Sequence, residues 1–523
     1  MTKKEEIGKK KEGFHWADGV AEQLIKERPK KPNEEYVVAA GVTPSGTVHI
    51  GNFREVITCA LVTRALKDKG KKVRFIYSWD DYDKLRKIPK NLPKQKLEKY
   101  LNKPTISTPD PFGCHKNYAQ HFEKEFEKSL HVVSIFPEFI YQSEMYRTCK
   151  YAEQIKFVLQ KKDEIRKILD KYRKEPLDKE WMPLVIYCEK CGKDTCRIKS
   201  YDNYEITYEC ECGYSNSIDF RKRGIVKLPW RIDWPMRKAY EKVDFEPAGK
   251  EHATPGGSWT TAKELLEMVW KTKPNIFLAY DFIILKGIGG KMSSSLGNVI
   301  TLGNCLEIYE PQILRYLFAS TKPNKEFAIS FDGDVIKIYA DFDKLEQDYF
   351  DKKLDKKQKR IYELSITKKP EKVFAAPFRQ LTELVQSRKP EEIIALYKKQ
   401  GGIKSKEDKE RTEKRIILAK NWLKYAPKEF LFKIQEKINK EKIKSIKEEY
   451  RKSLKKLVAQ IKKVETENEI IRKIKEIIEK NNLDTKEFFR VAYLIILGKE
   501  KGPRLSSIIM LEKEKIIKLL KQL

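Results

Sequence analysis

No apolar run in this chain approaches the ~20 residues that a membrane-spanning helix needs. The N-terminal segment "MTKKEEIGKKKEGFHW" lacks the hydrophobic stretch of a signal peptide. Glycine and proline become scarce after about residue 340, which excludes a loop-rich C-terminal region. We therefore expect a soluble, cytoplasmic protein that ends in a helical domain.

Cysteine is also sparse, and most of it is in one place. Five of the nine cysteines lie within residues 188–212. An odd number and such clustering in an intracellular chain indicate a metal site rather than disulfides. The other four cysteines fit ordinary buried thiols.

Acidic residues are outnumbered by basic ones. The chain has 109 Lys and Arg against 77 Asp and Glu, a formal charge of +32. This excess predicts a large polyanion as partner, such as a tRNA, DNA, a ribosome or an anionic membrane. The length of 523 residues and a hydrophobic content of 40% exclude a disordered chain and allow three or four domains.

Two apolar runs near the N-terminus predict a parallel sheet. Residues 36–42, "YVVAAGV", and 72–79, "KVRFIYSW", are strand-like, and segment 54–66 has apolar residues at helical spacing. Together they form a right-handed βαβ unit, so the predicted fold is α/β and Rossmann-like. The acidic cluster that begins at Asp80 follows the second strand, at the edge where such sheets bind ligands.

A further strand-like run, "NIFLAYDFIILKG", occurs much later, so a long insertion splits the nucleotide-binding domain. Apolar residues three or four apart within 443–461 and 470–478 then predict helices, and Asp484 and Glu487 predict a capping box. The predicted domains are a first sheet half at 1–84, the insertion at 85–228, a second half at 229–340, and an all-α domain at 341–523.

The stretch "AAGVTPSGTVHIGNFREV", residues 39–56, joins the first strand to the helix. Pro44, Ser45 and Gly46 turn the chain. His49 and Asn52 then share one face near the helix N-terminus, where unpaired N–H groups favour an anion. Taken alone, such a pattern more often means a capped helix with a partly exposed histidine.

A second glycine-rich segment, "GIGGKMSSSLGN" at residues 287–298, again follows an apolar run. Lys291 supplies a cation, and the serines from Ser293 to Ser295 supply hydroxyls that can surround phosphate. One such loop is a weak signal. Two phosphate-binding patterns in the order of a split Rossmann domain are a strong one.

These two segments resemble the HIGH and KMSKS signatures of class I aminoacyl-tRNA synthetases. The chain is most similar to the class I lysyl-tRNA synthetases, through "FHWADGVAEQLIKERP", "VTPSGTVHIGNFREV", "WDDYDKLRKIP", "LPWRIDWPMR", "GKEHATPGGSW", "GGKMSSSLGN" and "ILGKEKGPRL". Asn52 stands where the class has a second His, and Ser294 where it has a second Lys. Phosphate stabilisation is therefore expected to rest more on His49, Asn52, Lys291 and backbone amides.

The resemblance implies a two-step reaction by a monomer. L-Lysine reacts with ATP to give lysyl-adenylate, and the lysyl group then moves to the 3′-terminal adenosine of tRNA(Lys), with release of pyrophosphate and AMP; Mg²⁺ shares the phosphate charge. The residues implied in catalysis are His49, Asn52, Lys291, Ser293 and Ser294. Those implied in ATP binding are Pro44, Ser45, Gly46, His49, Gly51, Asn52, Gly256, Gly257, Lys291, Met292, Ser293, Ser294 and Ser295. For Gly256 and Gly257 a plain turn is the alternative.

Lysine selection requires a buried carboxylate, because desolvating an unpaired ammonium costs several kcal/mol. On physical grounds we predict Asp233 as this partner, with Asp80 as its competitor. The other lysine-binding residues implied by the resemblance are Gly41, Thr43, Trp230, His252 and Tyr280. For the tryptophan, ordinary core packing is the alternative.

The cysteine cluster predicts structural zinc. Cys188 and Cys191 form a CxxC, and Cys210 and Cys212 form a CxC, with 18 residues between the pairs. Two such knuckles across a hairpin place four thiolates around one Zn²⁺, in a ribbon at about 186–214 that we expect to touch the tRNA acceptor end. Reduced packing cysteines are the alternative, and Cys196 is either a bystander or a substitute ligand.

The lysine-rich C-terminal helices resemble the anticodon-binding domain of glutamyl enzymes, although charge runs on helices usually are solvated faces. Two rival interpretations remain open. The first is another class I synthetase, for glutamate or glutamine, which the acidic "WDDYD" and "WRIDW" oppose. The second is a catalytically dead, synthetase-like RNA-binding protein, which the intact His49 and Lys291 oppose.

Overall fold

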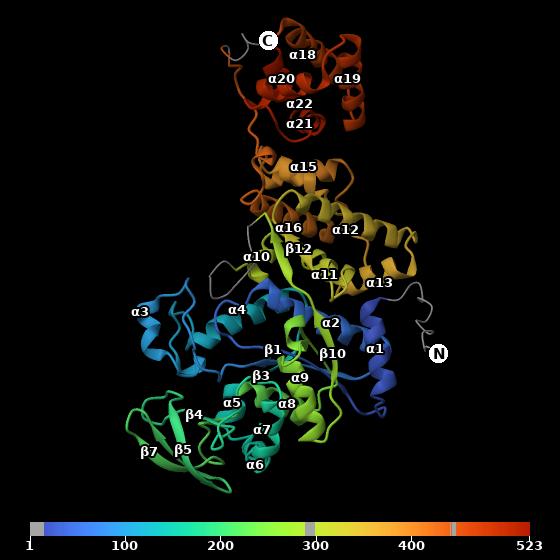
Figure 1. Ribbon diagram of the computed structural model, residues 1–523. Coiled ribbons are helices and arrows are strands. Elements are labelled where there is room, and N and C mark those ends of the chain that lie inside the picture. The colour runs from blue at the N-terminus through green and yellow to red at the C-terminus, as the bar shows by residue number, and fades with distance from the viewer. Residues whose placement is uncertain (1–14, 288–298, 440, 442–445) are drawn as a thin grey trace, which may run out of the picture.

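The chain forms an α/β body with a hairpin module at one end and stacked helices at the other (Figure 1). This is seen in a computed structural model that describes residues 15–287, 299–439, 441 and 446–523. Residues 288–298 of the predicted phosphate loop, with Lys291 and the serines 293–295, lie outside the described residues. None of the described helices combines the length and the apolarity that a membrane crossing requires.

A five-stranded parallel sheet forms the centre of the body. Its strand order is β10-β9-β1-β2-β3, and β1 runs beside β2 with Tyr36 opposite Val73. The strands are β1 (Tyr36–Val42), β2 (Val73–Trp79), β3 (Glu138–Tyr141), β9 (Phe245–Gly249) and β10 (Ile276–Tyr280). This confirms the two predicted strands and the Rossmann-like α/β fold. Because the order reverses at β1, the carboxyl end of β1 is where such a sheet binds ligands.

Helix α2 (Ile50–Asp68) packs on the sheet through fully buried side chains such as Val56, Ile57 and Leu61. His49 stands at its N-cap, so His49 and Asn52 lie at the helix N-terminus as predicted. The other helices of the body and the insertion are α1 (Trp16–Glu27), α3 (Lys94–Leu97), α4 (Tyr118–Val132), α5 (Gln142–Arg147), α6 (Ala152–Gln160), α7 (Lys162–Asp170), α8 (Trp230–Glu241) and α9 (Ser258–Met268).

The strand-like run 275–287 forms two strands in different sheets. After β10 the chain turns, and β11 (Ile283–Lys286) pairs with β12 (Phe327–Ser330). At the break, the N–H of Asp281 donates to the carbonyl oxygen of Pro323 at 2.9 Å, and the Asp281 carboxylate pairs with Lys250. A local apolar pattern cannot reveal this break, because the residue that holds it is distant in sequence.

The insertion begins after the edge strand of the sheet. Strand β3 falls within the predicted insertion range 85–228, so the first half of the sheet extends to Tyr141. A three-stranded antiparallel module and a two-stranded ribbon follow. Their strands are β5 (Cys196–Asp202), β6 (Glu205–Cys210) and β7 (Ser215–Asp219), and β4 (Val185–Ile186) and β8 (Val226–Lys227).

The C-terminal helices form two layers, which confirms the predicted helical region. The first layer shares the hydrophobic core of the body and is fixed to it by Arg360, which pairs with Asp18 of α1 and Asp68 of α2. Its helices are α10 (Leu302–Leu306), α11 (Pro311–Ser320), α12 (Asp334–Phe350), α13 (Lys356–Ser365), α14 (Phe378–Leu384), α15 (Pro390–Lys399) and α16 (Lys406–Trp422).

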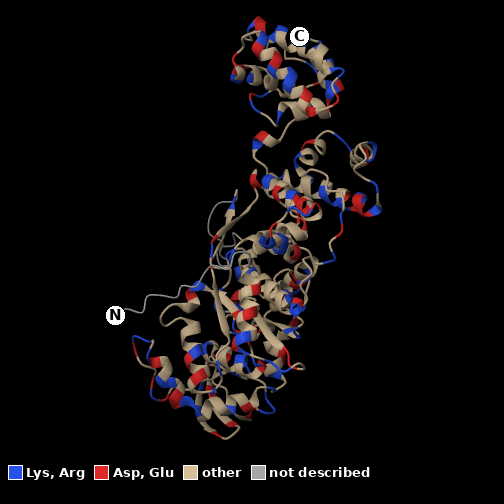
Figure 2. Ribbon diagram, turned by 90° about the vertical axis from the view of Figure 1, so that its right-hand side faces the viewer, with Lys and Arg blue, Asp and Glu red and all other residues tan. Residues whose placement is uncertain are grey.

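The second layer has a hydrophobic core of its own. Its helices are α18 (Glu448–Ile461), α19 (Glu467–Lys480), α20 (Thr485–Leu497), α21 (Leu505–Leu511) and α22 (Lys513–Leu520). Asp484 caps α20 as predicted, because its side chain accepts from the N–H of Glu487 at 2.7 Å. The side chain of Glu487 pairs with Arg490 instead of completing the predicted capping box. Lys and Arg residues are spread over both layers and over the body, interspersed with Asp and Glu (Figure 2).

Candidate active site

The start of α2 presents two polar side chains at the carboxyl end of β1. The backbone N–H of His49 donates to Oδ1 of Asn52 at 3.1 Å, which leaves the Asn52 NH₂ group as the donor available to a ligand. Nδ1 of His49 is buried without a hydrogen-bond partner among the described residues. Burial lowers the pKa of His49, so the imidazole is neutral near pH 7.

The residues that follow the second motif form backbone contacts with the first motif. The N–H of Ile50 donates to the carbonyl oxygen of Ile300 at 2.8 Å, and His49 forms a β-bridge with Thr301. Residues 299–301 directly follow the predicted phosphate loop. The residues directly after the second predicted motif therefore lie beside the first motif.

The turn between β1 and α2 is supported from the insertion side. The hydroxyl of Tyr118, at the start of α4, donates to the carbonyl oxygen of Ser45 at 2.9 Å. Pro44 and Gly46 are buried and Gly51 is half-buried. The predicted ATP-binding residues of this turn therefore lie together above the sheet, on a backbone that α4 holds in place.

The glycines before α9 form a tight turn. Gly256 has a φ of 73°, in the left-handed region that favours glycine. A Cβ on Gly257 would lie 2.5 Å from the carbonyl oxygen of His252, so no larger residue fits there. The turn is thus required by the backbone, and a contact of these glycines with ATP stays a prediction.

Two predicted lysine-binding residues meet on a carboxylate that the sequence did not suggest. The N–H of Gly41 donates to Oε1 of Glu55 at 2.9 Å, and the hydroxyl of Tyr280 donates to Oε2 at 2.9 Å. Burial, and then the charge of nearby Glu246, raise the pKa of Glu55 to about 8. Among the described residues no cation forms an ion pair with Glu55.

An aromatic wall lies beside this carboxylate. The indoles of Trp230 and Trp234 stack at 5.3 Å with an interplanar angle of 13°, and the imidazole of His252 lies 6.0 Å from each ring. Trp234 is buried and donates from Nε1 to Glu246 at 2.8 Å, so it is part of the core. Trp230 is only half-buried and remains accessible to a ligand.

The two acids favoured by the sequence are paired elsewhere. Asp80 binds Nη1 of Arg237 at 2.6 Å. Asp233 is 0% exposed, accepts a hydrogen bond from Tyr146, and lies 3.2 Å from Arg237 Nε and 3.7 Å from Lys227 Nζ. Their charges are therefore already neutralised by the protein. The clue in the sequence was Arg237, one helical turn after Asp233.

Thr43, also predicted to bind lysine, touches this buried ion network rather than Glu55. Its Oγ1 lies 3.4 Å from Oδ2 of Asp83, and the Asp83 carboxylate pairs with Lys227 at 2.7 Å. Gly41, by contrast, lies under Ser78, whose carbonyl oxygen would be 2.7 Å from an added Cβ. Only glycine fits at that position of β1.

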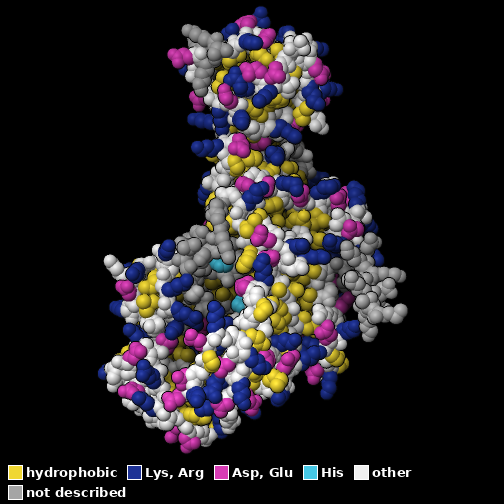
Figure 3. Space-filling view, viewed as in Figure 1, with side chains coloured by type: hydrophobic (Ala, Val, Ile, Leu, Met, Phe, Trp, Pro, Cys, Tyr) yellow, Lys and Arg dark blue, Asp and Glu magenta, His cyan; other side chains and the backbone are white. Residues whose placement is uncertain are grey.

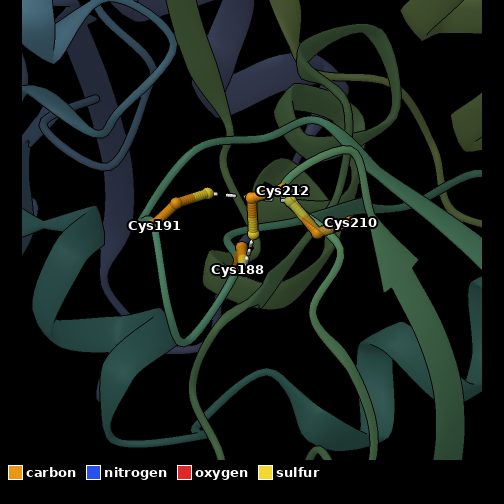
Figure 4. Close-up of side chains that lie close together, drawn as sticks. All are labelled: Cys188, Cys191, Cys210 and Cys212. Atoms are coloured by element: carbon orange, nitrogen blue, oxygen red, sulfur yellow. Dashed lines mark hydrogen bonds between the residues drawn. The ribbon is translucent and has the colours of Figure 1, made fainter.

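The four predicted zinc ligands converge (Figure 4). Sγ of Cys188 lies 3.7 Å from that of Cys212, and Sγ of Cys191 lies 3.6 Å from that of Cys210. A tetrahedral site with Zn–S bonds of about 2.3 Å has S···S edges of about 3.8 Å, so these thiols could bind zinc. Cys196 pairs with Cys210 across the hairpin but is not one of the four converging thiols.

A second convergent group was missed by the sequence analysis. Side-chain atoms of Asp110, Cys114, His115 and His121 all lie within 4.8 Å of one another. Sγ of Cys114 is 3.1 Å from Nδ1 of His115 and 3.2 Å from Nδ1 of His121. Carboxylate, thiol and imidazole are a zinc-type donor set. The signal was the local spacing D-x₃-C-H-x₅-H, which only an explicit search for mixed ligands would have found.

Comparison with known proteins gives matches along nearly the whole chain. A family described as "tRNA synthetases class I (K)" matches residues 14–368, and an "Anticodon binding domain" matches residues 417–523. The chain is 47% identical to the lysine–tRNA ligase of Borrelia garinii subsp. bavariensis, covering 95% of this chain and 96% of that protein. It is 41% identical to the lysine–tRNA ligase of Pyrococcus horikoshii, covering 97% and 99%.

Among solved structures, a glutamate tRNA ligase from Elizabethkingia meningosepticum matches with a TM-score of 0.42 and 15% identity, covering 93% of this chain and 99% of that one.

Proposed function

We propose how this site works from the premise that the chain belongs to the class I lysyl-tRNA synthetase family. It is a lysine–tRNA ligase, which activates L-lysine with ATP and transfers the lysyl group to the 3′-terminal adenosine of tRNA(Lys). The observation that carries the choice of amino acid is the carboxylate of Glu55, which Gly41 and Tyr280 hold and which forms no ion pair among the described residues. A glutamyl enzyme would need a positive charge at that place.

His49 and Asn52 would donate to the ATP phosphates. A neutral imidazole and an oriented amide at a helix N-terminus suit an anion, because they stabilise its charge without a proton transfer. Positioning and charge stabilisation supply most of the rate in such a phosphate-centred reaction. When bound, Mg²⁺ supplies further charge neutralisation on the phosphates.

The residues of the second motif would act on the leaving pyrophosphate. Lys291 and the hydroxyls of Ser293, Ser294 and Ser295 would surround it, with the backbone of Met292 alongside. The hydrogen bond from Ile50 to Ile300 supports this assignment, since it fastens the chain next to the loop beside His49. The turn residues Pro44, Ser45, Gly46 and Gly51, with Gly256 and Gly257, would let backbone approach the nucleotide.

Glu55 would hold the ε-ammonium of lysine, in place of Asp233 and Asp80. Breaking a buried ion pair leaves an uncompensated charge and costs about 3–5 kcal/mol, so Arg237 and Lys227 are expected to keep those two aspartates. Gly41 and Tyr280 would position the Glu55 carboxylate, and Trp230 and His252 would flank the aliphatic part of the substrate. Thr43 is kept among the proposed lysine-binding residues because the resemblance to class I lysyl-tRNA synthetases implies it.

Two metal sites would stabilise the part of the enzyme that is expected to contact the tRNA acceptor end. Cys188, Cys191, Cys210 and Cys212 would hold a structural Zn²⁺ in the hairpin module, which would touch the tRNA acceptor end. The mixed group around Asp110 would hold a second divalent ion at the start of α4. That helix carries Tyr118, whose bond to Ser45 supports a structural influence on the ATP-binding turn. We further propose that the enzyme acts as a cytoplasmic monomer.

ATP–pyrophosphate exchange with each amino acid, run with and without tRNA, tests this function. Exchange or tRNA charging with lysine, and with neither glutamate nor glutamine, is expected. Charging with an acidic or neutral amino acid would assign the chain to a different synthetase. Failure with every amino acid, in both conditions, would support a synthetase-like RNA-binding protein instead.

A further inference from the structure

A cavity of about 660 Å³ lies at the amino end of the central sheet. It is bordered by the last turns of α2, the start of β2, the loop that leads into β3, and helix α11. Strand β2 has seven residues, so about 20 Å of strand separates the cavity from the carboxyl end of the sheet. The candidate active site is at that carboxyl end, and the cavity is therefore a different site.

Arg315, on α11, lines this cavity and is only 5% exposed. Its guanidinium donates to the carbonyl oxygens of Val133 at 3.2 Å and Leu364 at 3.1 Å, while Nε has no hydrogen-bond partner among the described residues. Burial, and then the charge of Arg64, lower the pKa of Arg315 to about 10, and no carboxylate of the described chain offsets these effects. A cation that stays charged at neutral pH is thus buried without a counter-ion.

The hydroxyl of Thr63 is a second donor without a partner. Thr63, on α2, lines the same cavity and is only 7% exposed, and its Oγ1 has no hydrogen-bond partner in the described part of the chain. A helical threonine can donate to the carbonyl oxygen four residues earlier, as Thr58 does to Arg54 at 2.7 Å. Because buried polar groups are normally satisfied, two unsatisfied donors around one cavity indicate a ligand that accepts hydrogen bonds.

The charged side chains around the cavity are mostly cationic. Its lining contains four cations and two carboxylates, which are Arg64, Lys67, Arg74, Arg315, Glu35 and Glu138. Lys and Arg side chains, with Asp and Glu among them, also cover much of the face drawn in Figure 3. Exposed charges of that kind are screened by water and salt, whereas Arg315 is buried. The cavity therefore favours an anion that can reach this guanidinium.

The depth and size of the cavity restrict the kind of anion. Because Arg315 and Thr63 are almost fully buried, only a group at the end of a molecule can approach both of them. A backbone phosphate of RNA is a diester with chain on both sides, so it does not meet this condition. The volume is in the range of about 300–1,000 Å³ that is typical of small-molecule sites. Apolar lining residues that could contact an organic group are Ala60, Val73, Phe75, Ile135 and Phe136.

We propose that this cavity binds the phosphate group of a small phosphate monoester, with Arg315 and Thr63 as donors to its oxygens. We refer to it as the phosphate cavity. Arg64 and Lys67 add positive charge, and the organic part of the ligand lies against the apolar side chains. Charge-assisted hydrogen bonds from arginine are among the strongest contacts that a phosphate makes. The inference does not depend on the proposed lysine–tRNA ligase activity, because it concerns the opposite end of the sheet.

The first test is calorimetric titration of the full chain with phenyl phosphate, a monoester that is a dianion at about pH 7.5. Saturable binding with a millimolar or lower dissociation constant is expected. Thr63→Val keeps the shape and should weaken binding about tenfold, the effect of one hydrogen bond to a charged group. Its melting temperature should not fall, because the lost hydroxyl has no partner in the free protein.

Thr58→Val is the matched control, because Thr58 is a buried threonine of the same helix that does not line the cavity. It should bind phenyl phosphate like the parent and should have a lower melting temperature, because it loses the hydrogen bond to Arg54. The two threonine variants therefore separate ligand binding from stability in opposite directions.

Charge variants form the second test. Arg315→Gln should weaken binding by about 100-fold. Lys67 is exposed, so Lys67→Gln keeps the fold intact and should weaken binding about threefold. Lys72→Gln is its control, because Lys72 is also exposed but does not line the cavity. Dimethyl phosphate, a diester with one negative charge, should bind the parent about tenfold more weakly than phenyl phosphate.

Absence of saturable phenyl phosphate binding by the folded parent in the millimolar range would overturn the proposal. So would parental affinity in both Thr63→Val and Lys67→Gln. Binding that is lost in His49→Ala and kept in Thr63→Val would place the probe at the candidate active site instead. Dimethyl phosphate that binds as tightly as phenyl phosphate would overturn the choice of a monoester and indicate a nucleic acid backbone.

Discussion

Two carboxylates near the carboxyl ends of β1 and β2, the buried Asp233 and the half-buried Glu55, differ in what neutralises them. Asp233 is paired with Arg237 and Lys227, so its network is complete within the protein. Glu55 accepts only from neutral donors, and burial raises its pKa to about 8. A buried charge is costly unless it is paired. The comparison supports the proposal that the substrate ammonium pairs with Glu55, which forms no ion pair among the described residues.

The largest expected effect comes from Glu55→Gln, which removes the charge and keeps the shape. The buried ammonium then loses its counter-ion, which costs about 3–5 kcal/mol. The KM for lysine should therefore rise by about two to three orders of magnitude, with the KM for ATP little changed. Steady-state aminoacylation at varied lysine measures this. A lysine KM within a few-fold of the parent would show that Glu55 does not pair with the substrate ammonium.

Asp233→Asn should give the opposite pattern. Removing one partner leaves Arg237 and Lys227 buried with less compensation, so the free energy of unfolding should fall by about 3–5 kcal/mol. Lysine KM should stay within a few-fold of the parent in the protein that remains folded. Denaturant unfolding and lysine kinetics on the same preparation separate the two effects. A large rise in lysine KM with unchanged stability would indicate that Asp233, and not Glu55, pairs with the substrate ammonium.

The pH dependence of lysine binding sharpens the same comparison. The pKa of Glu55 is raised to about 8, so below that pH the free protein holds a proton that an ammonium must displace. The apparent Kd for lysine should thus rise about tenfold for each pH unit below 8 and level off above it. A flat profile between about pH 6 and 8 would mean that Glu55 is ionised before lysine arrives.

The two candidate metal sites, the four-cysteine group and the group around Asp110, resemble Glu55 in one respect. Their potential ligands lie close together with no Lys or Arg among them. Purified protein should contain about two divalent ions per chain, and Cys210→Ser and His121→Ala should each lose about one. Cys196→Ser is the control and should lose none. Mass spectrometry under native conditions measures the count. Equal loss in Cys196→Ser would make that thiol a ligand after all.

Much of this architecture follows from local pattern. The strands at 36–42 and 73–79 are continuous apolar runs, and Asp484 caps α20 through a contact only three residues away. The four cysteines sit at a spacing that leaves little freedom for the hairpin that carries them. Such features depend on neighbours in the sequence, so the sequence alone predicts them.

The proposed lysine partner, Glu55, could be found only from contacts between residues that are distant in the sequence. Glu55 lies on α2, where a glutamate ordinarily faces solvent, and it is enclosed because Tyr280 reaches it from 225 residues away in the chain. Asp233 seemed suitable because the sequence does not show that Lys227 folds back onto it. The break at Asp281 has the same cause, since Pro323 holds it. These three features depend on contacts between residues far apart in the sequence, so the local sequence pattern does not predict them.

Proton release on lysine binding tests the central claim most directly. Calorimetry at pH 7 in two buffers with different ionisation enthalpies counts the protons exchanged. Because the free Glu55 carboxyl is mostly protonated at that pH and must ionise to pair with the ammonium, the account predicts release of about one proton per lysine bound. The Glu55→Gln variant should release none at a lysine concentration high enough to bind. Binding by the parent without proton release would contradict the assignment of the substrate ammonium to Glu55.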